Sequence, residues 1–102
     1  MDEHRLIVAV CAGPLRGRKA ALRPGETLRI GRTELAGFSV PKDGRLSAQH
    51  FELRWDGARA RVRDLGSITG TKLNGEATAD GEVQHGGWIR AGDTDFTVHV
   101  ET

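Results

Sequence analysis

The alternation of apolar and polar residues around Asp56-Gly57 constrains the fold more than any other feature of the sequence. Apolar residues take every second position from Phe51 to Trp55, and they do so again between residues 58 and 63. This period of two is typical of a strand with one buried face, and Asp-Gly between two such runs is the strongest short-range signal for a β-hairpin. A two-residue turn pairs Glu52 with Arg61 and puts both apolar sets on one face. The sequence must therefore bury one face of a hairpin.

In the rest of the chain, short strand-like runs also end at turn residues, and apolar residues do not repeat with the period of a helix. Its 102 residues include 14 glycines, about twice the usual share of ~7%, and no long window repeats apolar residues at helical spacing. Short runs of strand-forming residues end at glycines and Pro-Gly pairs. A chain of this length is enough for one domain, so residues 1–102 are expected to form a single domain. We predict an all-β fold, a two-sheet β-sandwich of about nine to eleven short, mostly antiparallel strands.

The charge balance excludes several classes of partner. Fifteen Lys and Arg against fourteen Asp and Glu give a net charge of +1, so no sequence-wide field attracts nucleic acid or an acidic membrane. The apolar run from Leu6 to Val10 is too short for a membrane span and is predicted to be a first strand covered on both faces. Cys11 is the one cysteine, which excludes an internal disulfide and indicates a buried thiol in a reducing, cytoplasmic compartment.

Three clusters of polar residues and glycines flank predicted strands and are expected to form one binding edge. They are Gly31-Arg32, the segment Ser47-Ala48-Gln49-His50, and the segment from Asp64 to Gly75. Loops at strand ends are where binding groups are supplied on a rigid sheet. The clusters are therefore the first candidates for a functional site.

The order of these clusters resembles the forkhead-associated (FHA) domain, whose pattern is Gly-Arg, then Ser-x-x-His, then Asp-x-x-Ser-x-Asn-Gly-Thr-x-hydrophobic-Asn-Gly. The resemblance covers nearly the whole sequence, and three ordered motifs are specific where each alone is weak. It implies a two-sheet sandwich that binds phosphothreonine peptides through loops at one end. It also implies that Arg32 and Ser47 contact the phosphate, that Gly31 and His50 support the loops, and that Asn74-Gly75 forms a tight turn.

The chemistry of a phosphothreonine fits the first two of these residues. It carries a charge of about −1.5 to −2 and three acceptor oxygens, so its binder needs forked donors and hydroxyl or amide hydrogens. Arg32 and Ser47 offer such donors; Ser47 capping the turn into the next strand is an alternative, and the two roles are compatible. Arg45 is expected to favour an acidic residue on the C-terminal side of the phosphate, and a solvated loop charge is its alternative.

Two positions depart from the family pattern. Thr69 stands where the family most often has a peptide-gripping asparagine, and Ala48 follows the serine where the family can have a polar contact. An amide both donates and accepts along a peptide backbone, whereas Thr69 has one shorter hydroxyl and Ala48 has no side-chain hydrogen bond. Losing one or two such bonds, at about 1 kcal/mol each or roughly 1.5 to 3 kcal/mol where the partner is charged, is expected to lower affinity about tenfold or more. The pair Ile68-Thr69 is therefore expected to determine the affinity of this binding edge for a phosphopeptide.

These features predict a non-enzymatic, phosphothreonine-dependent interaction module in signalling, with a threonine-phosphorylated protein or peptide as partner. The main alternative is a module of the same fold that binds an unmodified protein or associates with itself. Nucleic-acid binding through the stripe from Arg59 to Arg63 lacks aromatic residues on that strand face. Ser47 and His50 lack an oxyanion arrangement, so no catalytic residue is expected. The four histidines have no metal-ligand spacing, and neither a metal nor a cofactor is expected.

Overall fold

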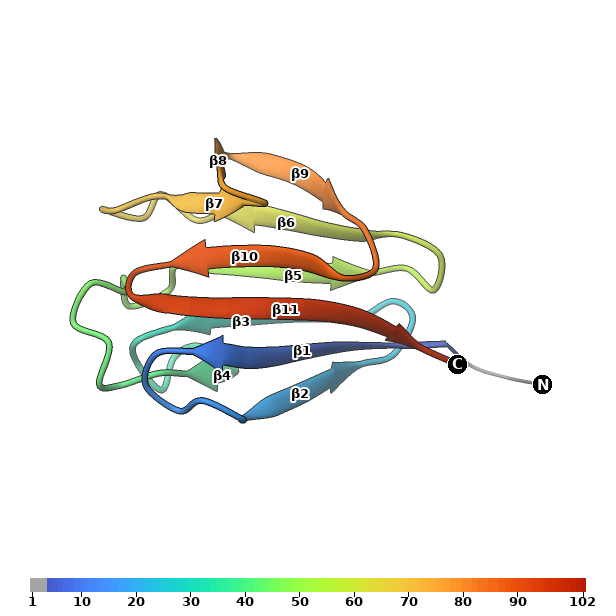
Figure 1. The fold of residues 1–102 in the computed structure, drawn as a ribbon, viewed down its shortest axis with the longest axis horizontal. Coiled ribbons are helices and arrows are strands. Elements are labelled where there is room, and N and C mark those ends of the chain that lie inside the picture. The colour runs from blue at the N-terminus through green and yellow to red at the C-terminus, as the bar shows by residue number, and fades with distance from the viewer. Residues whose placement is uncertain (1–3) are drawn as a thin grey trace.

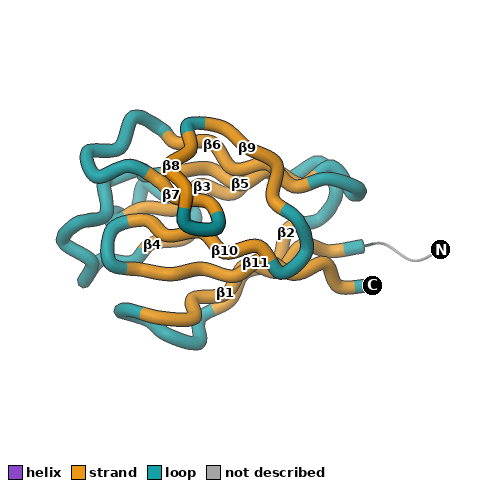
Figure 2. The backbone as a smooth tube through the Cα atoms, turned by 45° about the horizontal axis from the view of Figure 1, so that its top comes forward, coloured by secondary structure: helices purple, strands orange, loops and turns teal. Residues whose placement is uncertain are grey.

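The computed structural model describes residues 4–102, which form two β-sheets packed face to face (Figures 1 and 2). The six-stranded sheet has the order β2-β1-β11-β10-β7-β8, and the five-stranded sheet has the order β4-β3-β5-β6-β9. Paired strands are antiparallel except β3 and β4, which are parallel. The strands are β1 (Arg5–Ala12), β2 (Lys19–Leu22), β3 (Thr27–Gly31), β4 (Phe38–Ser39), β5 (Phe51–Trp55), β6 (Ala60–Asp64), β7 (Thr71–Leu73), β8 (Glu76–Thr78), β9 (Asp80–Val83), β10 (Gly87–Ala91) and β11 (Thr94–Glu101). The predicted all-β, two-sheet sandwich is confirmed.

The core fills the space between the two sheets. Each of the longer strands contributes its alternate apolar residues to it, as the period of two predicts. Phe51 of β5 and Phe96 of β11 meet edge to face across the sheets, with ring centroids 5.4 Å apart. Phe38 of β4 approaches the same Phe96 ring at 6.2 Å. Three aromatic rings from both sheets therefore anchor the end of the core that lies beneath the long loops, since β4 and β5 flank the connection that carries Ser47.

The first strand covers the core with one face only. β1 buries Leu6, Val8 and Val10, but the residues between them are only partly buried. The prediction that both faces are covered is wrong, because nothing among residues 4–102 packs on the outer side of the six-stranded sheet. Cys11 is exposed and its thiol contacts the carbonyl of Asp95 at 3.4 Å. The predicted buried thiol is therefore also wrong, since Cys11 follows the buried Val10 and the alternation of β1 places it on the outer side.

The hairpin of β5 and β6 has a different register from the predicted one. Glu52 lies opposite Arg63 rather than Arg61. The loop spans residues 56–59, because the carboxylate of Asp56 accepts the amides two and three residues ahead at 2.7 and 2.6 Å and so closes a wider turn. A shift of two residues keeps each side chain on its predicted face. The buried and exposed faces of this hairpin are as predicted, although the cross-strand partners are not.

One end of the sandwich, on the left in Figure 1, carries the connections β3–β4, β4–β5, β6–β7, β10–β11 and β1–β2. The three sequence clusters fall in or beside the first three of these connections. In the described part of the chain, no helix is long and apolar enough to cross a membrane. The fold thus gathers the candidate binding residues at one end of a rigid pair of sheets.

Candidate functional site

The β6–β7 loop is organised around the carboxylate of Asp64. One oxygen accepts the amides of Gly66 and Ser67, both at 3.0 Å. The other accepts the hydroxyls of Ser67 at 2.5 Å and Thr71 at 2.7 Å. Burial raises the pKa of Asp64, but the hydrogen bonds from Ser67, Thr71 and the loop amides outweigh it, so the pKa lies below its usual value. The ionised carboxylate therefore stabilises the conformation of the β6–β7 loop.

His50 joins this loop to the β4–β5 loop from a fully buried position. Its Nδ1 accepts the amide of Ser47 at 3.0 Å, and its Nε2 lies 2.8 Å from the carbonyl oxygen of Gly70. These partners assign the ring proton to Nε2, which donates to Gly70. The amide of Leu65 also donates to the carbonyl of His50 at 2.9 Å. His50 therefore ties together the two loops that carry Ser47 and Thr69, and both of its ring nitrogens are occupied by backbone groups.

Arg32 is placed against the β4–β5 loop by the glycine before it. A Cβ at Gly31 would lie 2.2 Å from the carbonyl oxygen of Ala48, so only glycine allows the two backbones to approach this closely. The amide of Arg32 donates to the carbonyl of Ser47 at 2.9 Å, and its Nε donates to the carbonyl of Leu46 at 3.1 Å. The guanidinium is thus positioned beside the Leu46-Ser47 peptide and remains exposed.

The hydroxyl proton of Ser47 and the terminal guanidinium nitrogens of Arg32 are not used within the described residues. The Ser47 hydroxyl accepts the amide of Ile68 at 3.1 Å, and its own proton has no acceptor among residues 4–102. The same residues contain no partner for the two terminal guanidinium nitrogens of Arg32. An adjacent hydroxyl and guanidinium with unused protons can bind an anion with several oxygens.

The remaining predicted peptide contacts surround this pair. Thr69 donates its hydroxyl proton to the carbonyl of Arg45 at 3.1 Å, which links the two loops a second time. Ile68 is 92% exposed. Ala48 is exposed, and its carbonyl accepts the Thr33 hydroxyl at 3.2 Å. The guanidinium of Arg45 is largely exposed.

Asn74 and Gly75 do not join this group. They form the β7–β8 turn with φ angles of 50° and 87°, at the opposite end of β7 from Gly70. The side-chain oxygen of Asn74 accepts the amide of Trp88 at 2.9 Å, and its backbone amide donates to the carbonyl of Trp88 at 2.7 Å. The pair therefore supports β10 and not the loops that carry the phosphate candidates.

Sequence reasoning missed a basic hollow next to Thr69. This hollow of about 350 Å³ is lined by Arg45, Thr69, Gly70, Lys72, Arg90 and Gly92. Lys72 and Arg90 are direct cross-strand partners on β7 and β10. They are far apart in the sequence, and no local pattern shows that these two strands pair. Only the strand order of the sheet could have revealed the site.

The arginine stripe on the five-stranded sheet is largely neutralised. Arg61 pairs with Asp80 at 2.9 Å, and Arg59 lies 3.8 Å from Glu82. Arg63 lies 3.8 Å from Glu52. These ion pairs leave little free positive charge for a nucleic-acid backbone. Residues 4–102 also contain no group of three His, Cys, Asp or Glu side chains placed to hold a metal ion.

The FHA domain family model matches residues 28–92 of this protein. The chain belongs to the FHA family. FHA domain-containing protein FhaA of Mycobacterium tuberculosis (strain ATCC 25618 / H37Rv) is 37% identical over 84 residues, which are 82% of this chain and 16% of FhaA. FHA domain-containing protein At4g14490 of Arabidopsis thaliana is 35% identical over 65 residues, 64% of this chain and 17% of that protein. The present sequence therefore spans about a sixth of the length of these relatives.

Solved FHA domains share the architecture. One, from a structural and functional analysis of phosphothreonine-dependent FHA domain interactions, has a TM-score of 0.86 and 33% identity, covering 96% of this chain and 98% of that one. The FhaA FHA domain in complex with the intracellular domain of Rv3910 has a TM-score of 0.82 and 34% identity, covering 92% and 99%. The family and the sandwich fold are thus as predicted, and the FHA domain is a non-catalytic binding module.

Proposed function

We propose that this FHA domain binds threonine-phosphorylated protein segments and that Arg32 and Ser47 contact the phosphate. The observation that carries the proposal is the adjacency of these two residues, with the Arg32 amide on the Ser47 carbonyl at 2.9 Å and with protons on both side chains that no described residue accepts. A phosphate offers three acceptor oxygens and about two negative charges to such donors. The phosphothreonine-dependent interactions of the solved FHA domain with 33% identity support the same assignment.

Four further residues are proposed to contact the peptide around the phosphothreonine. Ile68 presents an almost fully exposed side chain beside Ser47. Thr69 keeps its hydroxyl lone pairs for a peptide amide, because its proton is donated to Arg45. Ala48 leaves room but adds no polar contact. Arg45 lies 3.5 Å from Asp93 and would bind an acidic residue on the C-terminal side of the phosphothreonine.

The scaffold roles proposed for Gly31 and His50 follow from their contacts with the β4–β5 loop. The proposal treats residues 1–102 as one domain, because a single core joins both sheets in the described residues. It also includes a cytoplasmic location, supported by the intracellular domain that partners the FhaA FHA domain. A threonine-phosphorylated intracellular protein or peptide is the partner we expect for this protein.

A phosphorylation-independent module is the second candidate. Thr69 cannot donate to a peptide carbonyl while its proton is held by Arg45, and Ala48 has no polar side chain. Both features reduce the number of hydrogen bonds that the domain can make to a peptide backbone. An unmodified partner, or a second copy of this protein, would then bind without using the proposed phosphate-binding groups of Arg32 and Ser47.

Titration calorimetry with matched peptides separates the two candidates. Peptides carrying phosphothreonine, phosphoserine or unmodified threonine are titrated into the wild type, Arg32→Ala and Ser47→Ala. Arg54→Ala is the matched control, because Arg54 is exposed on the outer face of β5. Losing two charge-assisted bonds, at roughly 1.5 to 3 kcal/mol each, predicts that Arg32→Ala weakens phosphopeptide binding by a factor of about 100 or more. Equal affinity for the phosphorylated and unmodified threonine peptides would refute the proposal.

A further inference from the structure

Trp88 is a large apolar side chain that the structure holds in the open. It lies on the outer face of the six-stranded sheet and is 39% exposed. Its indole Nε1 donates to Asp95 at 3.0 Å, and its backbone amide donates to the side chain of Asn74 at 2.9 Å. A Cβ at Gly75 would lie 3.9 Å from the indole ring, so the β7–β8 turn borders it closely. The ring is therefore fixed before any partner arrives, which lowers the entropic cost of binding against it.

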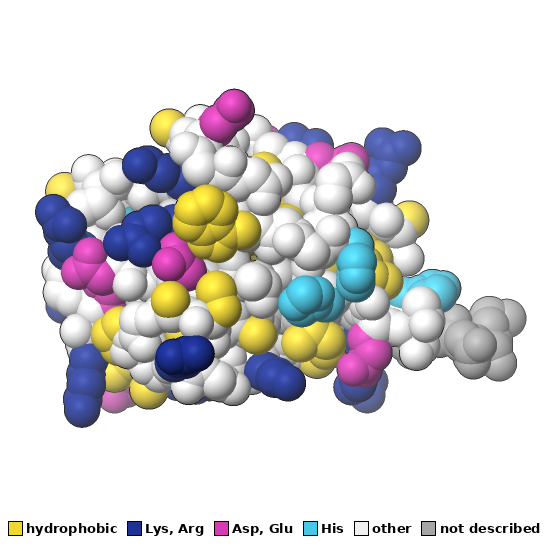
Figure 3. Space-filling model, in the orientation of Figure 1, with side chains coloured by type: hydrophobic (Ala, Val, Ile, Leu, Met, Phe, Trp, Pro, Cys, Tyr) yellow, Lys and Arg dark blue, Asp and Glu magenta, His cyan; other side chains and the backbone are white. Residues whose placement is uncertain are grey.

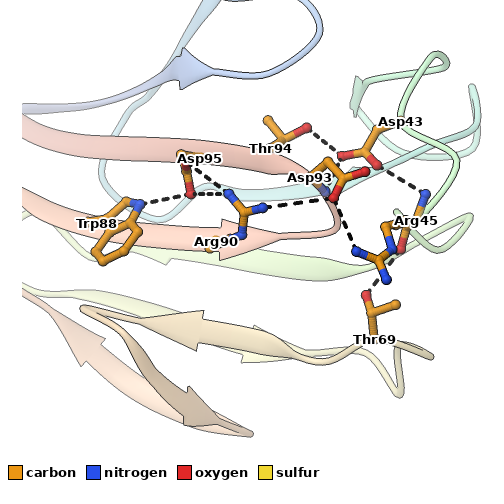
Figure 4. Close-up of polar contacts among 8 residues, drawn as sticks. All are labelled: Asp43, Arg45, Thr69, Trp88, Arg90, Asp93, Thr94 and Asp95. Carbon is orange, nitrogen blue, oxygen red and sulfur yellow. Dashed lines mark hydrogen bonds and ion pairs between the residues drawn. The ribbon is translucent and has the colours of Figure 1, made fainter.

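A series of polar contacts connects Trp88 to the proposed phosphopeptide loops (Figure 4). Asp95, which holds the indole, also accepts Arg90 Nη1 through both oxygens at 3.1 and 3.0 Å. Arg90 Nη2 lies 3.8 Å from Asp93, and Asp93 lies 3.5 Å from Arg45. The carbonyl of Arg45 in turn accepts the hydroxyl of Thr69. Trp88 and the loops are thus parts of one continuous surface.

Cations outnumber carboxylates in the middle of this surface. Three cations, Arg45, Lys72 and Arg90, line the hollow beside Thr69, and no carboxylate of a described residue lines it. Asp93 and Asp95 lie at its margin, where they pair with the arginines. In the described part of the chain Lys72 has no side-chain hydrogen bond or ion pair. Because Arg45 and Arg90 are paired with these carboxylates, the charge of Lys72 is the one that favours an anionic group on a partner segment crossing the hollow.

The cross-strand neighbours of Trp88 on β11 and β1 are uncharged and small. Its cross-strand partner on β11 is Thr97, and the next strand places Ala9 opposite Thr97. Figure 3 shows hydrophobic side chains over β10, β11 and β1, with basic and acidic side chains beside them toward the loops. A partner side chain laid on Trp88 toward β11 and β1 would therefore meet small, uncharged neighbours, while the Asp95 carboxylate that accepts the indole proton lies toward the loops.

We propose that the segment of the phosphorylated partner that flanks the phosphothreonine crosses the basic hollow with an acidic residue and reaches Trp88 with an aliphatic or aromatic residue. The proposal rests on the phosphothreonine-binding function proposed above and extends it to a second contact region. Arg90 and Trp88 are two residues apart on β10, about 6.5 to 7 Å along the strand. An extended partner segment that runs along β10 therefore presents the acidic and the apolar side chain two residues apart.

Three synthetic phosphothreonine peptides test the proposed spacing of two residues between the acidic and the apolar side chain. The first has neutral, small flanks; the second adds one glutamate, placed in turn at each flanking position; the third adds a leucine two residues beyond the glutamate that binds best. The leucine is expected to raise affinity about five- to tenfold in the wild type. In Trp88→Thr this gain disappears, while the first peptide keeps its affinity. A second phosphothreonine in place of the glutamate shows whether a phosphate or a carboxylate suits the hollow better.

Lys72→Gln gives an independent measurement, because Lys72 lines the hollow and is not among the proposed phosphate contacts. It is expected to reduce the gain from the glutamate and to leave the first peptide unchanged. Lys19→Gln, on β2 at the far edge of the same sheet, is the matched control and changes neither. A glutamate gain that survives Lys72→Gln overturns the charge part of the proposal.

Tryptophan fluorescence decides the apolar part even if Trp88→Thr folds poorly. The protein has two tryptophans, and Trp55 is only 2% exposed, so acrylamide quenching in the wild type reports mainly on Trp88. The third peptide is expected to protect Trp88 from quenching more than the second does, and Trp88→Phe removes the effect. Equal quenching with both peptides, or no affinity gain from leucine, overturns the proposal while phosphothreonine binding stands. If no phosphopeptide binds at all, the proposed function fails and this inference fails with it.

Discussion

Replacing Thr69 by asparagine tests how the loops hold the backbone of a bound peptide. In the structure the Thr69 hydroxyl donates its one proton to the carbonyl of Arg45 at 3.1 Å. Its lone pairs can still accept a peptide amide, but no proton remains for a peptide carbonyl. An asparagine has one acceptor and two donors, so Thr69→Asn can make both peptide contacts. We therefore expect tighter phosphopeptide binding, in the direction of the asparagine that most of the family carries here.

The expected changes in affinity and in stability follow from the number of hydrogen bonds gained and lost in Thr69→Asn. One additional hydrogen bond to the peptide contributes about 0.5 to 1.5 kcal/mol, which is roughly a two- to twelvefold gain in affinity. The bond to Arg45 is made in the free domain, so its loss lowers the free energy of unfolding of the domain, by about 1 kcal/mol or less at this exposed position. The two effects act on different quantities. Affinity is expected to rise while stability falls slightly.

Titration calorimetry at fixed salt and pH, with phosphorylated and unmodified threonine peptides, measures the first effect, and urea unfolding measures the second. Thr69→Val is the matched control, because it keeps the branched shape and removes the hydroxyl; it is expected to bind more weakly than the wild type and to lose the same bond to Arg45. If Thr69→Asn binds no more tightly than the wild type and Thr69→Val is unchanged, Thr69 does not contact the peptide, and the reasoning fails.

Three further outcomes follow from the same contacts. Gly31→Ala brings a Cβ within 2.2 Å of the carbonyl of Ala48 and should lower the free energy of unfolding by about 2 kcal/mol or more in urea; a cost near zero would contradict the close approach. Asp93→Asn frees Arg45 and leaves Arg90 paired with Asp95 alone, so it should strengthen binding of glutamate-bearing phosphopeptides more than neutral ones, as calorimetry would measure. The depressed pKa of Asp64 stabilises the fold above its unfolded value of 3.8, and this contribution is lost as pH falls through the lower folded pKa. Asp64→Asn should therefore unfold with a weaker dependence on pH below the unfolded pKa of 3.8; an unchanged dependence would contradict this role.

The sequence predicts the strands well where one face of a strand is buried. β5 and β6 alternate, and their buried faces are the predicted ones. The register of β5 and β6 was not predictable from Asp56-Gly57 alone, because the carboxylate of Asp56 closes a four-residue loop through two backbone amides. Side-chain hydrogen bonds of this kind compete with the two-residue turn that the dipeptide otherwise favours.

Other features depend on contacts between distant segments. The sequence did not predict β8 (Glu76–Thr78) or β9 (Asp80–Val83), which are short and mostly exposed and carry little apolar pattern. Their pairing with β7 and β6 forms them. The parallel pairing of β3 with β4 likewise has no local signal. The same holds for the basic hollow, whose cations come from strands that become neighbours only in the folded sheet.

The loops of the candidate site are held in place by their own contacts, which affects how the site can discriminate between partners. His50 and Thr69 link the β4–β5 and β6–β7 loops, and the Ser47 hydroxyl adds a third link through the amide of Ile68. A phosphate that binds Arg32 and Ser47 therefore does not have to order these loops, and little of its binding free energy is lost to their conformational entropy. Because a phosphate contact of this kind is the same for every phosphothreonine, it cannot distinguish one partner from another. Selectivity must come from the flanking surface that runs through Arg45 and beyond it to Trp88, where the side chains differ in charge and polarity from one position to the next.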